Sequence, residues 1–100
     1  MEPIDRKFRF RAFKVKNPAA SVSEMDGMVF KCADNAIPAT LDFYYKKSKE
    51  LGVSEEQLRG VELLIRRTGR WRRENPGECK VPDLDAGIEL ATVNAPNEPE

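Results

Sequence analysis

The sequence predicts a small single α+β domain, an antiparallel sheet packed against a pair of helices joined at Gly52. Apolar residues alternate with charged ones near the N-terminus, the period of a half-buried strand. From residue 37 to residue 68 the apolar spacing changes to three and four, the period of helices. The predicted order is β-β-α-α-β-β over residues 1–93, followed by a flexible, acidic, proline-containing tail at 94–100.

The first strand is predicted at residues 7–16. Phe8 and Phe10 alternate there with Arg9 and Arg11, and a later change of phase predicts a bulge near Arg11. A second strand is expected at 28–33, where alternate apolar residues share one face. Residues 21–26 between the two are expected to form a loop or a short helical turn.

The first helix is predicted to begin after the candidate N-caps Asp34 and Asn35, with Pro38 in its first turn, and to end at Gly52. Its predicted apolar stripe is Ile37, Leu41, Tyr44, Ser48 and Leu51. The second helix is expected to begin at the cap Ser54, with Gln57 completing a capping box, and to end at Gly69. Its stripe is Leu58, Val61, Leu64 or Ile65, and Thr68.

The last part of the domain is predicted to be a hairpin and a further strand. Asn75-Pro76-Gly77 is a turn signal between two short segments, Arg70 to Arg73 and Glu78 to Val81. Ile88 to Val93 is expected to form the final strand.

The composition excludes most catalytic chemistry. The chain contains no histidine, which removes imidazole bases and the usual nitrogen ligand of zinc. Its two cysteines, Cys32 and Cys79, are expected to be small buried hydrophobes and not a disulfide or a metal site. We therefore expect no enzyme activity, no catalytic residue, no cofactor, no metal and no small-molecule substrate.

A cytoplasmic location is also expected. The N-terminus lacks the apolar segment of a signal peptide, and no apolar run approaches the roughly 20 residues that span a bilayer. The sequence accordingly predicts no contact with a membrane.

The net charge of zero conceals an uneven distribution. Residues 1–16 carry a net charge of +4, residues 66–73 one of +5, and residues 74–100 one of −6. Such asymmetry indicates an interaction surface. Neutralisation of the two ends across a sheet is the alternative.

Five arginines around the only tryptophan, Trp71, are the strongest candidate site: Arg66, Arg67, Arg70, Arg72 and Arg73. The first two are expected at the negative end of a helix dipole. The other three, in the predicted strand, would point outward and hold phosphates or a partner's carboxylates by bidentate pairs. A solvated cationic face without a partner is the alternative.

Further candidates for partner or phosphate binding are Arg9, Arg11, Tyr45, Lys46 and Lys47. The first two form a cationic row that either binds a partner or protects a sheet edge from aggregation. An exposed aromatic residue near two lysines suits a binding surface or base stacking, unless the helix is buried on two sides. The predicted sheet would place the cationic row close to the arginines at 70–73.

The junction of the two helices resembles the core of a DNA-binding helix-turn-helix, over Ser48, Leu51, Gly52, Val53, Ser54, Leu58 and Val61. The resemblance implies that the second helix enters the major groove and the following hairpin acts as a wing. That helix carries Glu55, Glu56 and Glu62, which phosphates would repel. An ordinary αα-hairpin with a glycine turn explains the same residues.

These observations favour a non-enzymatic adaptor, regulator or inhibitor that binds a protein partner through an arginine-rich surface. A nucleic-acid-binding protein, using the helix pair and the basic hairpin, is the alternative. In size and composition the chain is also similar to phage accessory proteins that act on a host nucleic-acid-processing complex.

Overall fold

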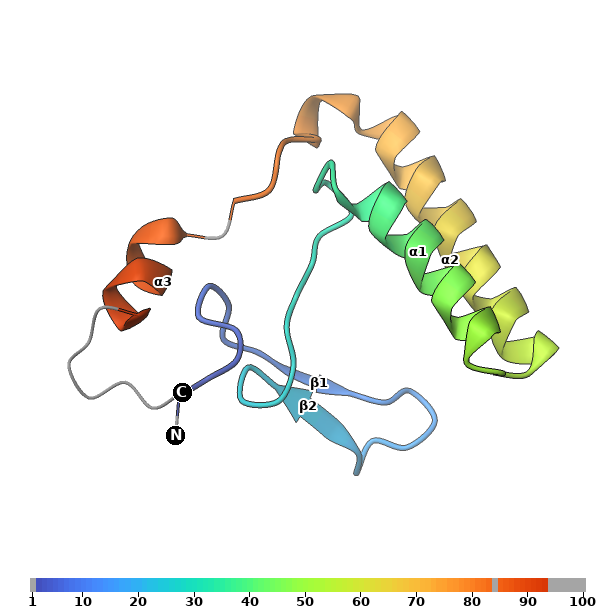
Figure 1. The fold of residues 1–100 in the computed structure, drawn as a ribbon, viewed down its shortest axis with the longest axis horizontal. Helices are drawn as coiled ribbons and strands as arrows, with labels where there is room; N and C mark the ends of the chain where they lie inside the picture. Colours follow the sequence, from blue (N-terminus) through green and yellow to red (C-terminus); the bar gives the residue numbers. More distant parts are fainter. Residues whose placement is uncertain (1, 84, 94–100) are drawn as a thin grey trace. The chain divides into compact units, whose positions relative to one another are not determined.

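The structure, a computed structural model, describes residues 2–83 and 85–93. Its elements are β1 (Arg11–Phe13), β2 (Ser21–Ser23), α1 (Ile37–Glu50), α2 (Glu55–Glu74), the 3-10 helix η1 (Pro76–Glu78) and α3 (Ala86–Val93) (Figure 1). A two-stranded antiparallel sheet together with helices is consistent with the predicted α+β class. The chain divides into two compact units: a first unit from the described residues of 1–29 and 83–100, and a second unit, 30–82.

The sheet of the first unit is shorter than predicted. Phe8 and Phe10 are half-buried between exposed neighbours, so the predicted alternation is confirmed. Their backbone N–H groups bond side-chain carboxylates instead of a neighbouring strand: Phe8 donates to Asp5 (2.8 Å) and Phe10 to Glu24 (2.8 Å). Only Arg11–Phe13 pairs as a strand, in regular register with Ser21–Ser23, so the predicted bulge is wrong.

The second strand lies in a different place from the prediction. Residues 21–23, expected in a loop or helical turn, form β2, and residues 28–33 form no strand. Met28 and Phe30 are exposed, and the Val29 N–H donates to the Asp5 carboxylate (2.8 Å). The alternation of apolar residues at 28–33 therefore did not indicate whether this segment pairs with another strand.

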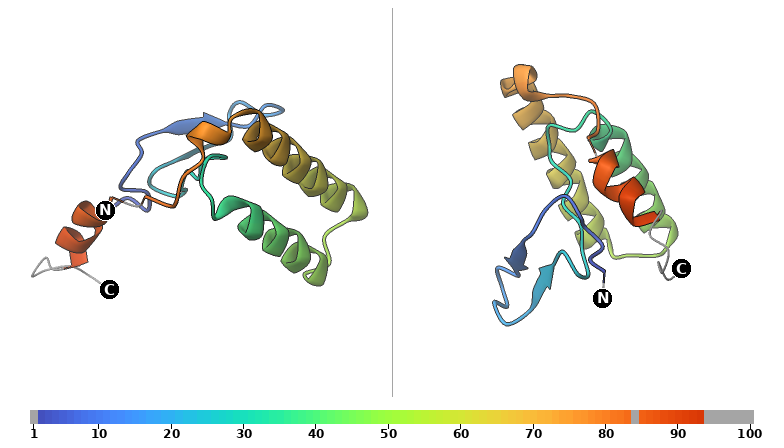
Figure 2. Two further views of the ribbon diagram at one scale, coloured as in Figure 1. Left: turned by 90° about the horizontal axis from the view of Figure 1, so that it is seen from above. Right: turned by 90° about the vertical axis from the view of Figure 1, so that its left-hand side faces the viewer.

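The helical hairpin of the second unit confirms the predicted helix pair. α1 and α2 run antiparallel and side by side in every view (Figures 1 and 2). The turn between them places Gly52 at φ +84°, a conformation that L-residues rarely adopt. The Ser54 hydroxyl accepts a hydrogen bond from the Gln57 N–H (3.1 Å), as its predicted role as N-cap requires. At α1, by contrast, the N-cap is Ala36, whose N–H donates to the Asp34 carboxylate (2.8 Å).

The second helix continues past its predicted end. Gly69 lies inside α2, which extends to Glu74, so the predicted stop at this glycine is wrong. Arg72 and Arg73, and not Arg66 and Arg67, therefore occupy the last turn, where the helix dipole favours cations. A mid-helix glycine costs about 1 kcal/mol relative to alanine, which the packing of a long helix outweighs.

Alanine substitutions at two glycines of the hairpin should change the free energy of unfolding in opposite directions. Gly52→Ala is expected to destabilise the protein by about 1 kcal/mol, because a Cβ is strained at a positive φ. Gly60→Ala should stabilise it by up to about 1 kcal/mol, because Gly60 lies inside α2 and a Cβ there meets nothing within 4 Å. Urea unfolding followed by circular dichroism tests the pair. Shifts of the same sign would contradict the assigned turn.

The predicted C-terminal hairpin and final strand are wrong. Residues 70–73 belong to α2, and the turn signal at 75–77 contributes to η1 instead. Beyond η1, Lys80 forms an isolated parallel bridge with Asp34, and Ala86–Val93 is helical. A short apolar run does not distinguish a strand from a helix by its period, which explains the error at α3. The predicted tail, 94–100, lies outside the described residues.

The buried core is sparse. Among the described residues, the buried apolar side chains are Ala33 and Ile37, and Thr68 is also buried; all three belong to the second unit. Cys32 is exposed and Cys79 is half-buried, so the expectation of two buried cysteines is wrong. The packing of the sheet on the helix pair would join residues of different units, and it stays a prediction.

Candidate functional site

The five predicted arginines lie on the last three turns of α2, and the helix distributes them around its circumference. Arg72 faces the chain segment that precedes α1. At about 100° per residue, Arg66 and Arg73 lie on one broad side of the hairpin, Arg67 lies on the other, and Arg70 points away from α1. The strand that would align Arg70 with Arg72 does not exist. The guanidiniums therefore do not share one surface.

Arg72 is engaged inside the protein. Its Nη1 donates to the backbone oxygens of Cys32 (2.9 Å) and Asp34 (3.1 Å), and its Nη2 donates to Oδ1 of Asn35 (3.0 Å). These three bonds fasten the last turn of α2 to the start of α1. The geometry thus gives this predicted partner-binding residue a structural role.

Two of the other arginines pair with carboxylates of their own helix. Arg66 Nη2 lies 3.1 Å from Oε1 of Glu62, and Arg70 Nε lies 2.9 Å from Oε1 of Glu74. Both pairs are exposed and have the i,i+4 spacing, which stabilises a helix by a few tenths of a kcal/mol. Among the described residues, Arg67 and Arg73 have no ion-pair partner.

The remaining predicted site residues lie in both units. Lys46 pairs with Asp42 (2.9 Å) and Lys47 with Glu50 (3.1 Å) along α1, while Tyr45 is half-buried. Arg9 and Arg11 are exposed in the first unit, where the Arg11 guanidinium lies 5.4 Å from the centre of the Phe13 ring. Their proximity to the arginines of the second unit stays a prediction.

A second set of residues on the hairpin forms a surface that was not predicted. The less exposed positions are Ile37, Leu41, Tyr45 and Ser48 on α1 and include Leu58, Val61, Ile65, Thr68 and Arg72 on α2, and their helical spacing assigns them to the contact between the two helices. Their periodicity places four other side chains together on one broad side of the antiparallel pair. These are Tyr44, Leu51, Leu64 and Trp71, which we call the apolar face.

The apolar face is open to solvent. Tyr44 is 57% exposed, Leu51 72% and Leu64 43%, and Trp71 is half-buried. Phe43, 67% exposed, lies by helical spacing on the side of α1 that points away from α2. Single exposed apolar residues are ordinary on a protein surface, whereas the residues of the apolar face share one side of a helix pair.

The opposite side of the hairpin is polar and carries several ion pairs. It carries the ion pairs between Asp42 and Lys46 and between Glu62 and both Arg59 and Arg66. Helical spacing alone assigns the residues of α1 and α2 to these two sides, and ion pairs form along the polar one, where Arg73 has no ion-pair partner among the described residues. The hairpin therefore has one polar side and one apolar side.

The pairing of the helices differs from that of a helix-turn-helix. In that motif the second helix crosses the first steeply and enters the major groove. Here α1 and α2 lie alongside each other, the arrangement of an αα-hairpin (Figure 1). The structure therefore has the ordinary hairpin that the same glycine turn permits.

Asp5 is a polar centre of the first unit. Oδ1 of Asp5 accepts hydrogen bonds from the N–H groups of Lys7 (2.9 Å) and Phe8 (2.8 Å), and Oδ2 accepts one from Val29 (2.8 Å). The bonds from Phe8 and then Val29 lower the pKa of this carboxyl most strongly; burial opposes them, and the amide and charge of Lys7 assist. Asp5 thus holds together two segments distant in sequence.

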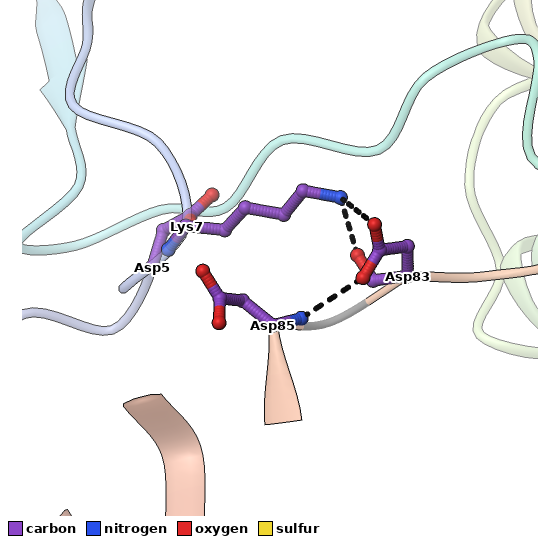
Figure 3. Close-up of polar contacts among 4 residues, drawn as sticks. All are labelled: Asp5, Lys7, Asp83 and Asp85. Atoms are coloured by element: carbon purple, nitrogen blue, oxygen red, sulfur yellow. Dashed lines mark hydrogen bonds and ion pairs between the residues drawn. The ribbon is translucent and has the colours of Figure 1, made fainter. Parts of the chain in front are cut away.

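Lys7 extends this centre to the C-terminal part of the chain (Figure 3). Its ammonium donates to the backbone oxygen of Asp83 and lies 3.9 Å from the Asp83 carboxylate. The Asp83 carboxylate in turn accepts a hydrogen bond from the Asp85 N–H (3.3 Å). This arrangement secures the chain ahead of α3.

An open hollow of about 650 Å³ adjoins this centre in the first unit. It is lined by three cations and three carboxylates, together with apolar residues that include Phe8, Met25 and Ile88. The balanced charge selects no class of ligand. Within the described part of the chain, no group of three or more acidic or cysteine side chains is placed to hold a metal ion. None of the described helices is both long and apolar enough to cross a membrane.

Comparison with known proteins adds no family: no protein-family model, curated protein or solved structure matches this chain.

Proposed function

We propose that this chain is a non-enzymatic protein-binding module, an adaptor, regulator or inhibitor, that engages its partner through the apolar face of the α1–α2 hairpin. The observation that supports this is the gathering of Tyr44, Leu51, Leu64 and Trp71 on one side, three of them more than 40% exposed. Aromatic residues and arginine are the types enriched where partners bind. The proposal keeps the cytoplasmic location that the sequence predicts.

Two features favour this surface over the full set of arginines. Arg72 is occupied by three internal acceptors, and Arg66 and Arg70 are paired within α2. Arg67 lies beside the apolar face and has no ion-pair partner among the described residues, so it remains open to a partner. Of the five arginines that the sequence predicts to bind a partner, the proposal thus keeps one, Arg67, at the edge of the apolar face.

Adjacent leucines on α2 provide a matched test. Leu64→Ser is expected to weaken partner binding by roughly tenfold to a hundredfold, because it removes an apolar contact at the centre of the face. Leu63→Ser should leave binding unchanged, because Leu63 is similarly exposed (38%) but points away from α1. The partner is first captured from the source cell and identified, and its affinity for each variant is then measured with purified proteins.

Binding of nucleic acid in place of a protein partner would overturn this proposal. Duplex DNA, single-stranded DNA and RNA are titrated with the full chain at about 50 and about 200 mM salt, a range over which phosphate contacts weaken steeply. We expect no micromolar binding. Salt-sensitive binding that Arg67→Ala and Arg73→Ala abolish, and that Leu64→Ser leaves intact, would assign the surface to nucleic acid.

A further inference from the structure

We infer that the segment bound by the apolar face is an acidic amphipathic helix of the partner protein. This inference rests on the proposed function and specifies the chemistry of its partner. α1 and α2 lie side by side and antiparallel, with exposed apolar side chains contributed by both helices. Two such helices bury their remaining apolar side by packing a third helix along them, through residues at i, i+3, i+4 and i+7.

The charges that border the apolar face determine which charge the partner's helix should carry. Along Ile37–Glu50 and Glu55–Glu74, helical spacing places Lys47 and Arg67 beside the apolar side chains. Glu74, three residues after Trp71, also borders them, but it is already paired with Arg70 (2.9 Å). Lys47 is paired with Glu50 at the outer edge of α1 (3.1 Å). Arg67 has no such partner among the described residues, so it is the main cation available to a carboxylate. A helix with acidic residues flanking its apolar stripe is complementary to this surface.

The same charges disfavour a second copy of this chain as the occupant. A symmetric dimer through the apolar face would bring the same surface of two chains together. Both copies would then bring Arg67 and Lys47 to the interface, and like charges at an interface cost affinity. Asp42 and Glu62 lie on the polar side, and Glu50 and Glu74 are already paired with Lys47 and Arg70 of their own chain.

The experiment uses Trp71, the single tryptophan of the chain, as an internal reporter on the face. The full chain is titrated with two tryptophan-free helical peptides of about 14 residues, a length that exceeds three helical turns. Both carry leucine at i, i+3, i+4 and i+7, and they differ only in glutamate or lysine at the flanking positions. We expect the glutamate peptide to shift the emission of Trp71 to the blue and to bind at least about tenfold more tightly than the lysine peptide.

Two variants of α2 form the matched pair. Arg67→Glu should abolish or reverse the preference for the acidic peptide, whereas Arg73→Glu, on the polar side, should leave it unchanged. Neither arginine has an ion-pair partner among the described residues, so no existing pair is broken. Circular dichroism confirms that both variants keep their helical content, and Arg67→Gln removes the charge without adding repulsion.

Three results would overturn the inference. The first is equal affinity for the two peptides, and the second is a preference that Arg67→Glu leaves intact. The third is a dimer in light scattering that Leu64→Ser dissociates, which would make a second copy the occupant. If the identified partner still loses affinity with Leu64→Ser while the acidic peptide shows no preference, the inference fails and the proposed function stands.

Discussion

Replacing Arg72 by alanine is expected to destabilise the second unit by about 1–2 kcal/mol. The variant removes three hydrogen bonds that join α2 to the segment before α1, and it leaves the oxygens of Cys32 and Asp34 without these donors. Arg72→Lys should recover less than half of the loss, because one ammonium cannot reproduce a planar fork that reaches three acceptors. Chemical unfolding followed by helical circular dichroism measures both variants.

Arg73→Ala is the control for this prediction. Arg73 occupies the same last turn of α2, so both substitutions lose the same favourable interaction with the helix dipole. The difference between them therefore isolates the three hydrogen bonds of Arg72. Equal destabilisation by Arg72→Ala and Arg73→Ala would show that these bonds contribute nothing measurable.

Asp5→Asn is expected to loosen the first unit. An amide has one acceptor oxygen, so one side of the new side chain turns N–H donors toward the N–H groups of Phe8 or Val29. We expect hydrogen exchange at Lys7, Phe8 and Val29 to accelerate by about tenfold or more. Asp42→Asn, the same substitution in an exposed ion pair of α1, is the control and should leave these amides protected.

The lowered pKa of Asp5 predicts how the first unit responds to acid. A carboxyl whose pKa is lowered by folding contributes stability that is present in full above its unfolded pKa of about 3.8. That contribution disappears as the pH falls through the folded pKa. The amide resonances of Phe8 and Val29 should therefore titrate at a pH below the ordinary range for Asp. A midpoint at or above the ordinary value would contradict the hydrogen-bond network.

The helix pair was predictable because its signals are local. Ser54 caps α2, Gly52 adopts the positive φ of a turn, and the spacing of three and four extends over several turns. The end of α2 was not predictable in the same way. Glycine is a residue at which helices commonly end, so Gly69 indicated a stop. The hydrogen bonds of Arg72 to residues 32–35 favour the extra turns instead, and those residues are distant in the sequence.

The sheet was harder to predict because the backbone of the first unit is satisfied by side chains. Asp5 and Glu24 accept the amide hydrogens of Phe8, Phe10 and Val29, which a strand would have offered to its neighbour. A pattern of alternating apolar residues contains no information about which acceptor an amide finds. The alternation was confirmed and the pairing was wrong.

The candidate site was predicted in part. The arginine cluster was evident in the sequence, but its arrangement depended on whether residues 70–73 are strand or helix. Helical geometry separates Arg67 from Arg66 and Arg73 and places it beside Leu64 and Trp71. The helical spacing of Leu64, Arg67 and Trp71 could have indicated the apolar face from the sequence. It does so only if α2 is known to continue past Gly69.

Site-specific photo-cross-linking tests the central claim most directly. A benzophenone amino acid is placed at position 64 or at position 63 of the full chain in the source cell, and the cross-linked products are identified by mass spectrometry. Binding through the apolar face predicts a protein cross-link from position 64, reduced by Tyr44→Ser in the same chain, and little or none from position 63. Equal cross-linking from both positions, or a product with nucleic acid in place of protein, would contradict it.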